Sequence, residues 1–411
     1  MTIETSPEGG WLPARELRKP LPESTDVLIV GGGLAGTALA YYLARTGVEC
    51  ALVERAELNR EASGTNAGSF HFQIALHQLT APETANVRHR LETEVRLHAE
   101  AAEVWKTLER ELAGPLDIHV TGGLMVAETP RELQLLHDKR EIEQEAGLET
   151  HVLEGEELRS FAPFLADDLP GATWCPHEGH ANPMLAAPLF ALRAAEAGAE
   201  LRTHAAVTRI DVDPDGGARR FTVRTAAGRI RAHRIVDAAG AWANDVAALV
   251  GIRLAIRAEG LHLNVTEPRA HVLGPIVQHI GRRLTLKQSA NHTFIIGGGW
   301  PANPEPPPAR FSTTWESTAG NVAVAVRVVP LLAGVQIVRT WSGVMAFTDD
   351  LAPIAGESQR VPGFHTLIAT TGFTLSPLLA QLLAQSLATG RETIPAEYSV
   401  DRATAGQATT T

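Results

Sequence analysis

The sequence predicts a fold that joins an α/β part to an α+β part. Near the beginning of the chain, apolar runs at 26–30 and 50–53 flank a helical stretch at 37–45, which is the pattern of a strand–helix–strand unit. Between 252 and 338, β-like runs alternate with turns, which is typical of an antiparallel sheet. Because the chain of 411 residues is longer than one hydrophobic core usually allows, we expect two domains.

The other expected elements follow from periodicity and stop signals. Residues 83–113 show a helical apolar stripe in which His98 is the one polar member, and Gly114-Pro115 ends it. The apolar members are Val87, Leu91, Val95, Ala102, Trp105, Leu108 and Leu112. We expect further helices at 130–146, 185–197 and 377–389, and strands at 206–212, 221–225, 234–237 and 364–369. Residues 1–24 and 398–411 are polar and are expected to be tails.

Composition argues against several classes of function. The formal net charge is −11 and no basic stripe is present, which disfavours nucleic-acid binding. The only two cysteines, Cys50 and Cys175, suggest no disulfide framework, so we expect a reducing, cytoplasmic location. The first 24 residues lack a continuous apolar core, and the longest apolar stretch, 322–338, is short for a bilayer. We therefore expect neither a signal peptide nor an integral membrane segment.

The strongest motif is a glycine-rich turn that directly follows the first strand and begins the first helix. It reads Gly31-Gly32-Gly33-Leu34-Ala35-Gly36 and contains the G-x-G-x-x-G spacing. Gly31 permits the tight turn, Gly33 lets a pyrophosphate approach the backbone, and Gly36 lets the helix pack on the strand. Glu54 ends the second strand, where a carboxylate can accept ribose hydroxyls and disfavours a 2′-phosphate. The motif predicts a bound dinucleotide, and by itself leaves NAD and FAD open.

Later segments narrow this choice. Two of these segments follow the second strand: Arg55 and Glu61-Ala62-Ser63-Gly64-Thr65-Asn66-Ala67-Gly68-Ser69. Five more come later in the chain: Asp237-Ala238-Ala239-Gly240-Ala241-Trp242, Trp341-Ser342-Gly343, Thr348-Asp349-Asp350, Pro353-Ile354-Ala355-Gly356 and Thr371-Gly372-Phe373-Thr374-Leu375-Ser376-Pro377. With the glycine motif, they resemble the D-amino-acid oxidase superfamily of FAD-dependent oxidoreductases. Within it, the resemblance is greatest to the branch that holds glycine oxidase and the sarcosine oxidase β-subunit. The resemblance spans roughly 26 to 390, with the parts in the family's order.

The resemblance implies the cofactor and its contacts. The cofactor is expected to be non-covalent FAD, because neither cysteine lies in the C-terminal region where monomeric sarcosine oxidases attach theirs. The implied FAD contacts are Gly31, Gly33, Leu34, Ala35, Gly36, Glu54, Arg55, Ser63, Gly64, Thr65, Asn66, Ala67, Gly68, Val207, Ala239, Gly240, Trp242, Gly343, Gly372, Phe373, Thr374 and Leu375.

The resemblance also implies two interleaved domains. A Rossmann-like FAD-binding domain would collect 25–82, 150–246 and 338–397. A substrate domain built on the antiparallel sheet would collect 83–149 and 247–337, and the flavin would lie between the two.

The implied reaction is hydride transfer from an amine-bearing carbon to flavin N5, with O2 or another electron acceptor reoxidising the flavin. The implied substrate is a small amine or amino acid. The sequence departs from the family at two positions, because Met345 and Thr374 stand where glycine oxidase-like sequences carry arginines for a substrate carboxylate. A secondary amine or an N-substituted amino acid is therefore favoured, with Arg257, Lys287 and Arg339 as other candidates for a carboxylate.

Two residues are candidates for catalytic roles. Lys287 lies in a β-like run where relatives place a basic residue facing the flavin, and a cation there would favour negative charge on the reduced ring. The alternative is a solvated surface lysine. His71 closely follows the loop at 61–69, and either faces the flavin or substrate or is a hydrogen-bonded histidine without a chemical role.

Other interpretations of the sequence concern metal binding and partners. The stretch Cys175-Pro176-His177-Glu178-Gly179-His180 gathers possible metal ligands, but no second cluster accompanies it, so a loop is expected and no metal site. The chain acts either as a self-sufficient oxidase or dehydrogenase, or as the flavin-bearing subunit of a hetero-oligomer of the opine or sarcosine type, inactive without partners. An RNA-modifying flavoprotein is disfavoured by the negative charge.

Overall fold

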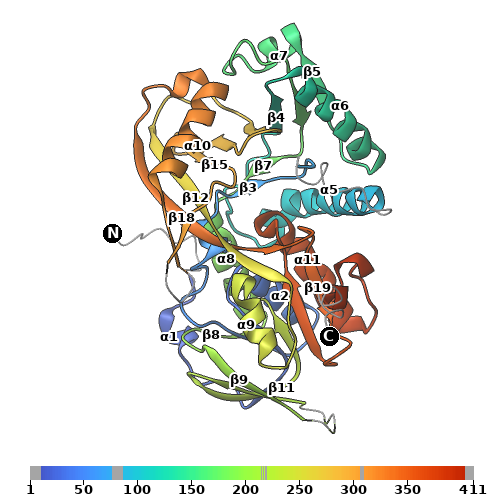
Figure 1. Ribbon diagram of the computed structural model, residues 1–411. Coiled ribbons are helices and arrows are strands. Elements are labelled where there is room, and N and C mark those ends of the chain that lie inside the picture. Colours follow the sequence, from blue (N-terminus) through green and yellow to red (C-terminus); the bar gives the residue numbers. More distant parts are fainter. Residues whose placement is uncertain are drawn as a thin grey trace.

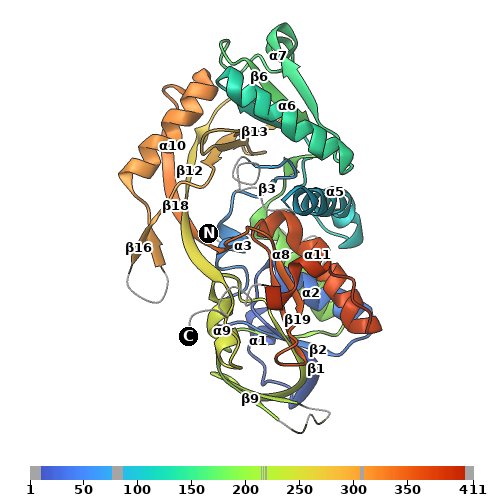
Figure 2. The ribbon, with the colours of Figure 1, turned by 45° about the vertical axis from the view of Figure 1, so that its right-hand side comes forward.

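A computed structural model describes residues 11–75, 87–213, 215, 217, 220–305 and 310–402. The chain forms two bodies, one above the other in the view of Figure 1, each built on an eight-stranded sheet. Two long strands, β12 (Ile256–Pro268) and β18 (Ile337–Thr348), run between these bodies (Figures 1 and 2). No helix in the described part of the chain is long and apolar enough to cross a membrane.

The lower sheet has the strand order β19-β20-β11-β1-β2-β8, with β10 and β9 continuing from β11. Its pairs from β20 to β8 are parallel, as in a Rossmann-like sheet. The strands are β1 (Ser24–Val30), β2 (Cys50–Val53), β8 (Glu200–Arg202), β9 (Val207–Val212), β10 (Phe221–Thr225), β11 (Gly228–Asp237), β19 (Ile354–Glu357) and β20 (Phe364–Ile368). The predicted strand–helix–strand unit is β1, α2 (Leu34–Arg45) and β2.

Helices bury the apolar face of this sheet. Helix α2 packs against both α8 (Pro183–Glu196) and α11 (Gly372–Thr389), and α11 also packs against α5 (Val87–Glu111). One core cluster joins side chains from all of these elements, including Leu39, Trp105 and Leu379. The apolar stripe predicted for 83–113 therefore faces the lower body. The start of that predicted helix at 83–86 lies outside the described residues, as does the side chain of Val87.

The upper sheet has the order β18-β12-β15-β14-β13-β4-β6-β5. All of its pairs are antiparallel except β13 with β4. Its strands are β4 (Gly123–Ala127), β5 (His151–Glu154), β6 (Gly171–Cys175), β12 (Ile256–Pro268), β13 (Ile276–His279), β14 (Thr285–Gln288), β15 (Thr293–Gly297) and β18 (Ile337–Thr348). This is the antiparallel sheet that the runs between 252 and 338 predict.

The remaining elements are short or peripheral. Helix α6 begins with a capping box between Thr129 and Glu132, which satisfies two otherwise unpaired N–H groups. The helices are α1 (Ala14–Leu17), α3 (Ala62–Thr65), α6 (Pro130–Glu145), α7 (Gly155–Phe161), α9 (Ala243–Ala248) and α10 (Trp315–Val328), with the 3₁₀ turns η1 (Gly240–Trp242), η2 (Pro330–Leu332) and η3 (Ala396–Tyr398). Two small two-stranded sheets pair β3 (Ser69–Phe70) with β7 (Gly179–His180), and β16 (Asn303–Glu305) with β17 (Arg310–Ser312).

The arrangement differs in places from the expected domain boundaries. Strands β5 and β6 fall in the expected FAD segment 150–246, but they pair within the upper sheet. Strand β18 lies in the upper sheet although most of it falls in the expected segment 338–397. The expected tail at 1–24 includes α1 with a buried Leu17, and the start of β1. The expected tail at 398–411 begins with a buried Tyr398. The junction expected at 82/83 lies outside the described residues, as do 1–10 and 403–411.

Candidate functional site

A cavity of about 1190 Å³ lies where the two bodies meet. One part of its wall is the glycine turn after β1 and the residues after β2 and β11; the other part comes from the upper sheet, mainly β12, β13 and β18. The N-terminus of α11 also lines the cavity. The position fits the general rule for open α/β sheets, in which ligands bind beyond the carboxyl ends of the parallel strands.

The glycine turn has no room for side chains. A Cβ atom on Gly31 would stand 2.4 Å from the carbonyl oxygen of Ala238, and one on Gly36 would stand 2.0 Å from that of Gly31. Gly31 also has φ +120°, which favours glycine. A Cβ on Gly33 would stand 2.9 Å from Ser63 Oγ. The backbone at the start of α2 is therefore bare toward the cavity, as a cradle for phosphates requires.

Glu54 holds this turn from the side. Its Oε2 accepts a hydrogen bond from the Gly32 N–H at 2.7 Å, and its Oε1 accepts one from the Ala56 N–H at 2.8 Å. Each carboxylate oxygen can accept a second bond, and Glu54 lines the cavity. Glu54 can therefore accept hydrogen bonds from ribose hydroxyls, as predicted, while it also supports the glycine turn.

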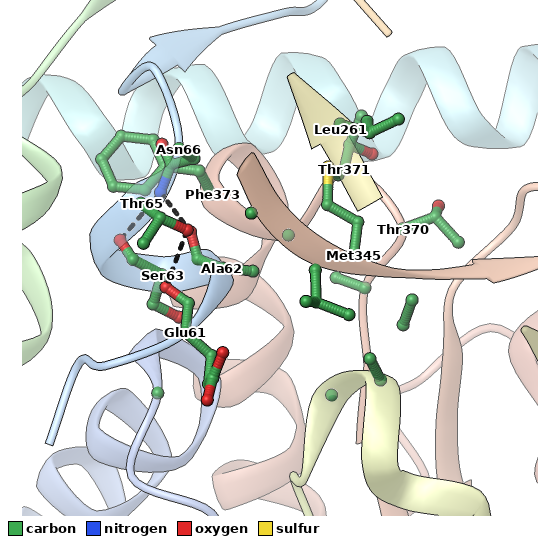
Figure 3. A pocket seen from close by; sticks show the side chains of 18 of the residues that line it. Glu61, Ala62, Ser63, Thr65, Asn66, Leu261, Met345, Thr370, Thr371 and Phe373 are labelled. Carbon is green, nitrogen blue, oxygen red and sulfur yellow. Dashed lines mark hydrogen bonds between the residues drawn. The ribbon is translucent and has the colours of Figure 1, made fainter. Parts of the chain in front are cut away.

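The loop predicted from 61–69 wraps the start of α2 and touches the upper body. Ser63 Oγ accepts from the Leu34 N–H at 2.9 Å, and the Asn66 side chain bonds the carbonyl groups of Ala62 and Ser63 at 2.9 and 2.8 Å. In Figure 3, Ser63, Thr65 and Asn66 lie on one side of the pocket, and Leu261 and Met345 on the other.

Strand β18 closes on this loop at one point. Trp341 Nε1 donates to the Thr65 carbonyl oxygen at 2.7 Å. A Cβ on Gly343 would stand 2.6 Å from Thr65 Oγ1. The W-x-G spacing therefore serves to bring the upper sheet against the loop.

An arginine and a tryptophan form another part of the wall. The Arg55 guanidinium lies 3.8 Å from the centre of a Trp242 ring, and it pairs with Glu61 at 3.1 Å. Both Arg55 and Trp242 line the cavity. Stacking of this kind orders both side chains by a cation–π contact.

Unsatisfied polar atoms gather around the cavity. Buried polar atoms normally find a hydrogen-bond partner, so a group of exceptions calls for a ligand. His279 apart, whose Nε2 pairs with Glu128 at 3.2 Å, seven lining residues have a buried side-chain nitrogen or oxygen without a hydrogen-bond partner in the described part of the chain: Asn59, Ser69, His71, His98, Trp242, His262 and Thr371. Together with the bare glycine cradle, these atoms fit a large polar ligand such as a dinucleotide.

The comparison with known families decides which ligand. Residues 26–386 match the DAO family, described as FAD dependent oxidoreductase. The chain belongs to this family. Its cofactor is FAD, and the glycine cradle, Glu54 and the loop at 61–69 are the groups present to hold it.

Within the matched segments, curated relatives are about a quarter identical to the chain. Mitochondrial sarcosine dehydrogenase of Homo sapiens is 28% identical over 373 residues, a match that covers 87% of this chain and 39% of the relative. The chain thus spans about two fifths of the length of that enzyme. A protein of Rhizobium meliloti that is named as one subunit of an opine oxidase is 28% identical over 381 residues, with 89% of this chain and 94% of the relative covered.

Solved structures share the fold. L-proline dehydrogenase from P. horikoshii superposes with a TM-score of 0.83 at 24% identity, over 94% of this chain and 99% of the other. Glycine oxidase from Geobacillus kaustophilus gives 0.78 at 24% identity, over 92% and 99%. The fold expected from the sequence, a Rossmann-like domain with a substrate domain on an antiparallel sheet, is confirmed.

Most residues predicted to bind FAD line the cavity. These are Gly31, Gly33, Ala35, Glu54, Arg55, Ser63, Thr65, Asn66, Ala67, Gly68, Val207, Ala239, Gly240, Trp242, Gly343, Gly372, Phe373 and Thr374. Of the predicted residues, Leu34, Gly36, Gly64 and Leu375 do not border it. Leu34 and Leu375 have buried side chains, while Gly36 and Gly64 allow close backbone packing.

The two predicted catalytic residues differ in position. His71 lines the cavity, and its backbone N–H donates to Thr374 Oγ1 at 3.2 Å. Lys287 does not border the cavity; it is buried on β14, two residues from Thr285, which does. Because side chains alternate along a strand, Lys287 and Thr285 share a face of the sheet. Burial lowers the pKa of Lys287 to about 7. Its charge in turn contributes to a lowered pKa of His71.

The structure also locates the other candidates for a substrate carboxylate. Arg257 lines the cavity, but Glu259 and Asp349 both pair with it, at 2.5 and 2.7 Å. Arg339 is exposed on β18 and does not line the cavity. Arg283, which no sequence motif singles out, lines the cavity and makes no ion pair with any described residue.

The stretch Cys175–His180 connects β6 to β7. In the part of the chain that the structure describes, no three His, Cys, Asp or Glu side chains are grouped to hold a metal ion. Glu178 is instead fully buried, and its Oε1 accepts from the backbone N–H groups of Phe72 and Gln73 at 2.8 and 3.0 Å. Its Oε2 accepts from the side-chain amides of Gln73 and Gln278. Sequence reasoning missed this role, because the partners lie about 100 residues away.

Proposed function

We propose that the chain oxidises the C–N bond of a small amine or amino acid, with a secondary amine or an N-substituted amino acid as the favoured substrate. The observation that carries this proposal is that one cavity joins the FAD cradle to a polar end walled by the upper sheet and α5. A substrate in that end would lie next to the cofactor. Relatives named for sarcosine, opine and dimethylglycine oxidation support the substrate class.

Bound FAD supplies the hydride acceptor for such a reaction. The residues of this chain position the partners. The N-terminus of α11, from Thr371 to Thr374, lines the cavity, and its positive dipole end favours negative charge beside it. His71 presents a neutral ring at pH 7, because burial and the nearby Lys287 lower its pKa to about 4. A neutral ring avoids repelling a substrate ammonium group.

Lys287 supplies a second, adjustable charge. With a pKa near 7 it gains or loses a proton in the physiological range, and its Coulombic influence reaches His71 and His180. A cation on this side of the cavity would favour negative charge that develops on the reduced cofactor or on reduced oxygen. Lys287 and His71 therefore remain our candidates for catalytic roles.

The favoured substrate follows from the missing arginines. Met345 lines the cavity without a charge, and Thr374 accepts the His71 N–H and, through its carbonyl oxygen, the Trp105 Nε1–H at 2.8 Å. Neither can pair with a carboxylate. A small amino acid held at these two positions is thereby disfavoured, and Arg283, which follows β13 in the upper body, is available to receive a carboxylate.

A second candidate is the flavin-bearing subunit of a hetero-oligomer that is inactive without partners. The observation that favours it is the match to the opine oxidase of Rhizobium meliloti, because the relative is named as one subunit and the match covers nearly the full length of both chains. We also propose that the protein is cytoplasmic, that O2 or another electron acceptor reoxidises the flavin, and that the protein has no nucleic-acid partner.

The test is anaerobic reduction of the purified chain, reconstituted with FAD, by a panel of amines. Bleaching of the visible flavin bands by sarcosine, proline, N-alkylated amino acids or opines supports the proposal. Bleaching by alcohols or glycerol phosphate and by none of the amines would overturn it. A yellow protein that amines reduce only after its partner chain is added would favour the second candidate.

A further inference from the structure

Helix α5 contributes a histidine to the cavity wall, although the apolar pattern of the helix does not indicate it. His98 is the polar member of an otherwise apolar stripe, and it is 4% exposed. It lines the cavity, and so does His71, which directly precedes Phe72, the residue whose carbonyl oxygen His98 contacts. Two imidazole rings from separate elements therefore meet at the same end of the cavity.

The protonation of His98 is fixed by its contact. Its Nδ1 lies 3.1 Å from the carbonyl oxygen of Phe72. A carbonyl oxygen only accepts, so Nδ1 carries the hydrogen and Nε2 carries a lone pair in the neutral ring. That Nε2 is buried and has no hydrogen-bond partner among the residues that the structure describes. Burial lowers the pKa of His98 to about 4, so the ring is neutral at pH 7.

His71 offers a second such nitrogen. Its Nδ1 is buried and has no hydrogen-bond partner among the described residues. In the neutral ring, Nδ1 is an acceptor when the hydrogen is on Nε2.

The segment that follows His71 and orients the His98 ring is held firmly. The backbone of residues 72–74 is anchored from behind, since Glu178 accepts from the N–H groups of Phe72 and Gln73, and Glu143 accepts from that of Ile74 at 2.7 Å. The Phe72 carbonyl on this segment orients His98. Such anchoring is what a preorganised binding site needs, because its nitrogens then cost little entropy when they bind.

We propose that His71 Nδ1 and His98 Nε2 form a hydrogen-bond-accepting subsite for the substrate. The group that fits carries N–H or O–H donors, such as a hydroxyl, ammonium or guanidinium on the N-substituent of an amino acid. A plain alkyl substituent would leave both nitrogens unsatisfied, which a buried site tolerates poorly. This inference rests on the proposed function, and it narrows the substrate from any secondary amine to one with a donor-bearing arm.

The experiment compares matched arms on glycine in the FAD-loaded enzyme. N-(2-hydroxyethyl)glycine and N-(2-aminoethyl)glycine carry donors, and N-propylglycine has the same length without one. The ether analogues of the hydroxyethyl and propyl compounds, in which oxygen replaces the amine nitrogen, have no C–N bond and therefore report binding alone through the flavin spectrum. We expect donor-bearing arms to bind on the order of 10-fold more tightly than propyl, one hydrogen bond of about 1.4 kcal/mol.

Variants separate this subsite from a structural role. His98→Leu should abolish the preference between arms, whereas His98→Gln, which keeps an acceptor, should restore part of it. His137→Leu is the matched control, because that histidine is exposed and pairs with Glu154 at 3.0 Å outside the cavity. If His98→Leu does not fold, His71→Leu and His98→Gln carry the same comparison.

The outcomes also separate the inference from the proposed function. Equal binding of all arms to the wild type overturns the subsite, even if amines are oxidised. Selective binding of donor-bearing ethers without oxidation of any amine keeps the subsite and sinks the proposed reaction. Loss of FAD affinity in His98→Leu, with an unchanged arm preference, would assign the nitrogen to the cofactor and overturn the proposal.

Discussion

Replacement of Lys287 by methionine tests the electrostatics of the cavity wall. Lys287 is 4% exposed, and burial lowers its pKa from the ordinary 10.5 to about 7. A group whose folded pKa is depressed in this way binds its proton more weakly in the folded than in the unfolded chain. Above pH 10.5, Lys287 is neutral in both the folded and the unfolded chain and does not lower the free energy of unfolding. As the pH falls toward about 7, the unfolded chain binds the proton more strongly, and the protein loses stability.

The size of the effect follows from these two pKa values. At 1.36 kcal/mol per pKa unit, the lysine costs about 4 kcal/mol of unfolding free energy at pH 7 and about 2 kcal/mol at pH 9. Methionine has a similar shape and no charge. The variant should therefore gain stability relative to the wild type, and that gain should shrink by about 2 kcal/mol between pH 7 and pH 9.

The assay is urea unfolding of both proteins at saturating FAD, at pH 7, 8 and 9. Lys106→Met is the control, since Lys106 is exposed on α5 and its replacement should change the free energy equally at each pH. A difference between Lys287→Met and wild type that does not vary with pH would refute the reasoning, because it would mean that Lys287 is solvated.

Three further predictions concern the cradle, the buried acid and the substrate position. Gly36→Ala should abolish FAD binding and lower the free energy of unfolding by several kcal/mol, because its Cβ would stand 2.0 Å from the Gly31 carbonyl oxygen. Flavin absorbance measures the first effect and urea unfolding the second. Burial raises the pKa of Asp237, so the wild type loses stability as the pH rises above 4 and this buried carboxyl has to ionise. Asp237→Asn should therefore stabilise the protein increasingly with rising pH, and melting temperatures measured from pH 5 to 8 check this. Met345→Arg should improve KM for glycine by about 10-fold relative to N-alkylglycines, since it adds a cation to the cavity wall; steady-state kinetics would contradict it by showing no change.

The FAD cradle could be predicted because its determinants are local. Gly31, Gly33 and Gly36 lie in one short turn between an apolar strand and a helix, so their spacing alone identifies the turn, even though Gly31 and Gly33 pack against residues much later in the chain. The elements themselves also followed local patterns: β2 was predicted at its observed bounds, and α6 within a residue. Helix α11 begins five residues before the prediction, at Gly372, because Pro377 inside it disguised the first turn.

The substrate side of the cavity could not be predicted in the same way. Glu178 acts on Phe72 and Gln73, more than 100 residues earlier, and no spacing rule connects them. His98 reads as an exception within an apolar stripe, and only the fold shows that the cavity lies beside it. The domain boundaries shifted for a related reason: β5 and β6 carry no local sign of which sheet they join.

The central claim is that an FAD in the cavity takes a hydride from the carbon beside an amine. The most direct measurement is the visible spectrum of the FAD-loaded chain during anaerobic addition of N-substituted amino acids, followed by the identification of the carbonyl product. We predict bleaching of the oxidised flavin bands and one carbonyl compound formed per flavin reduced. A flavin that stays oxidised with every amine, while an alcohol or a glycerol phosphate bleaches it, would contradict the account.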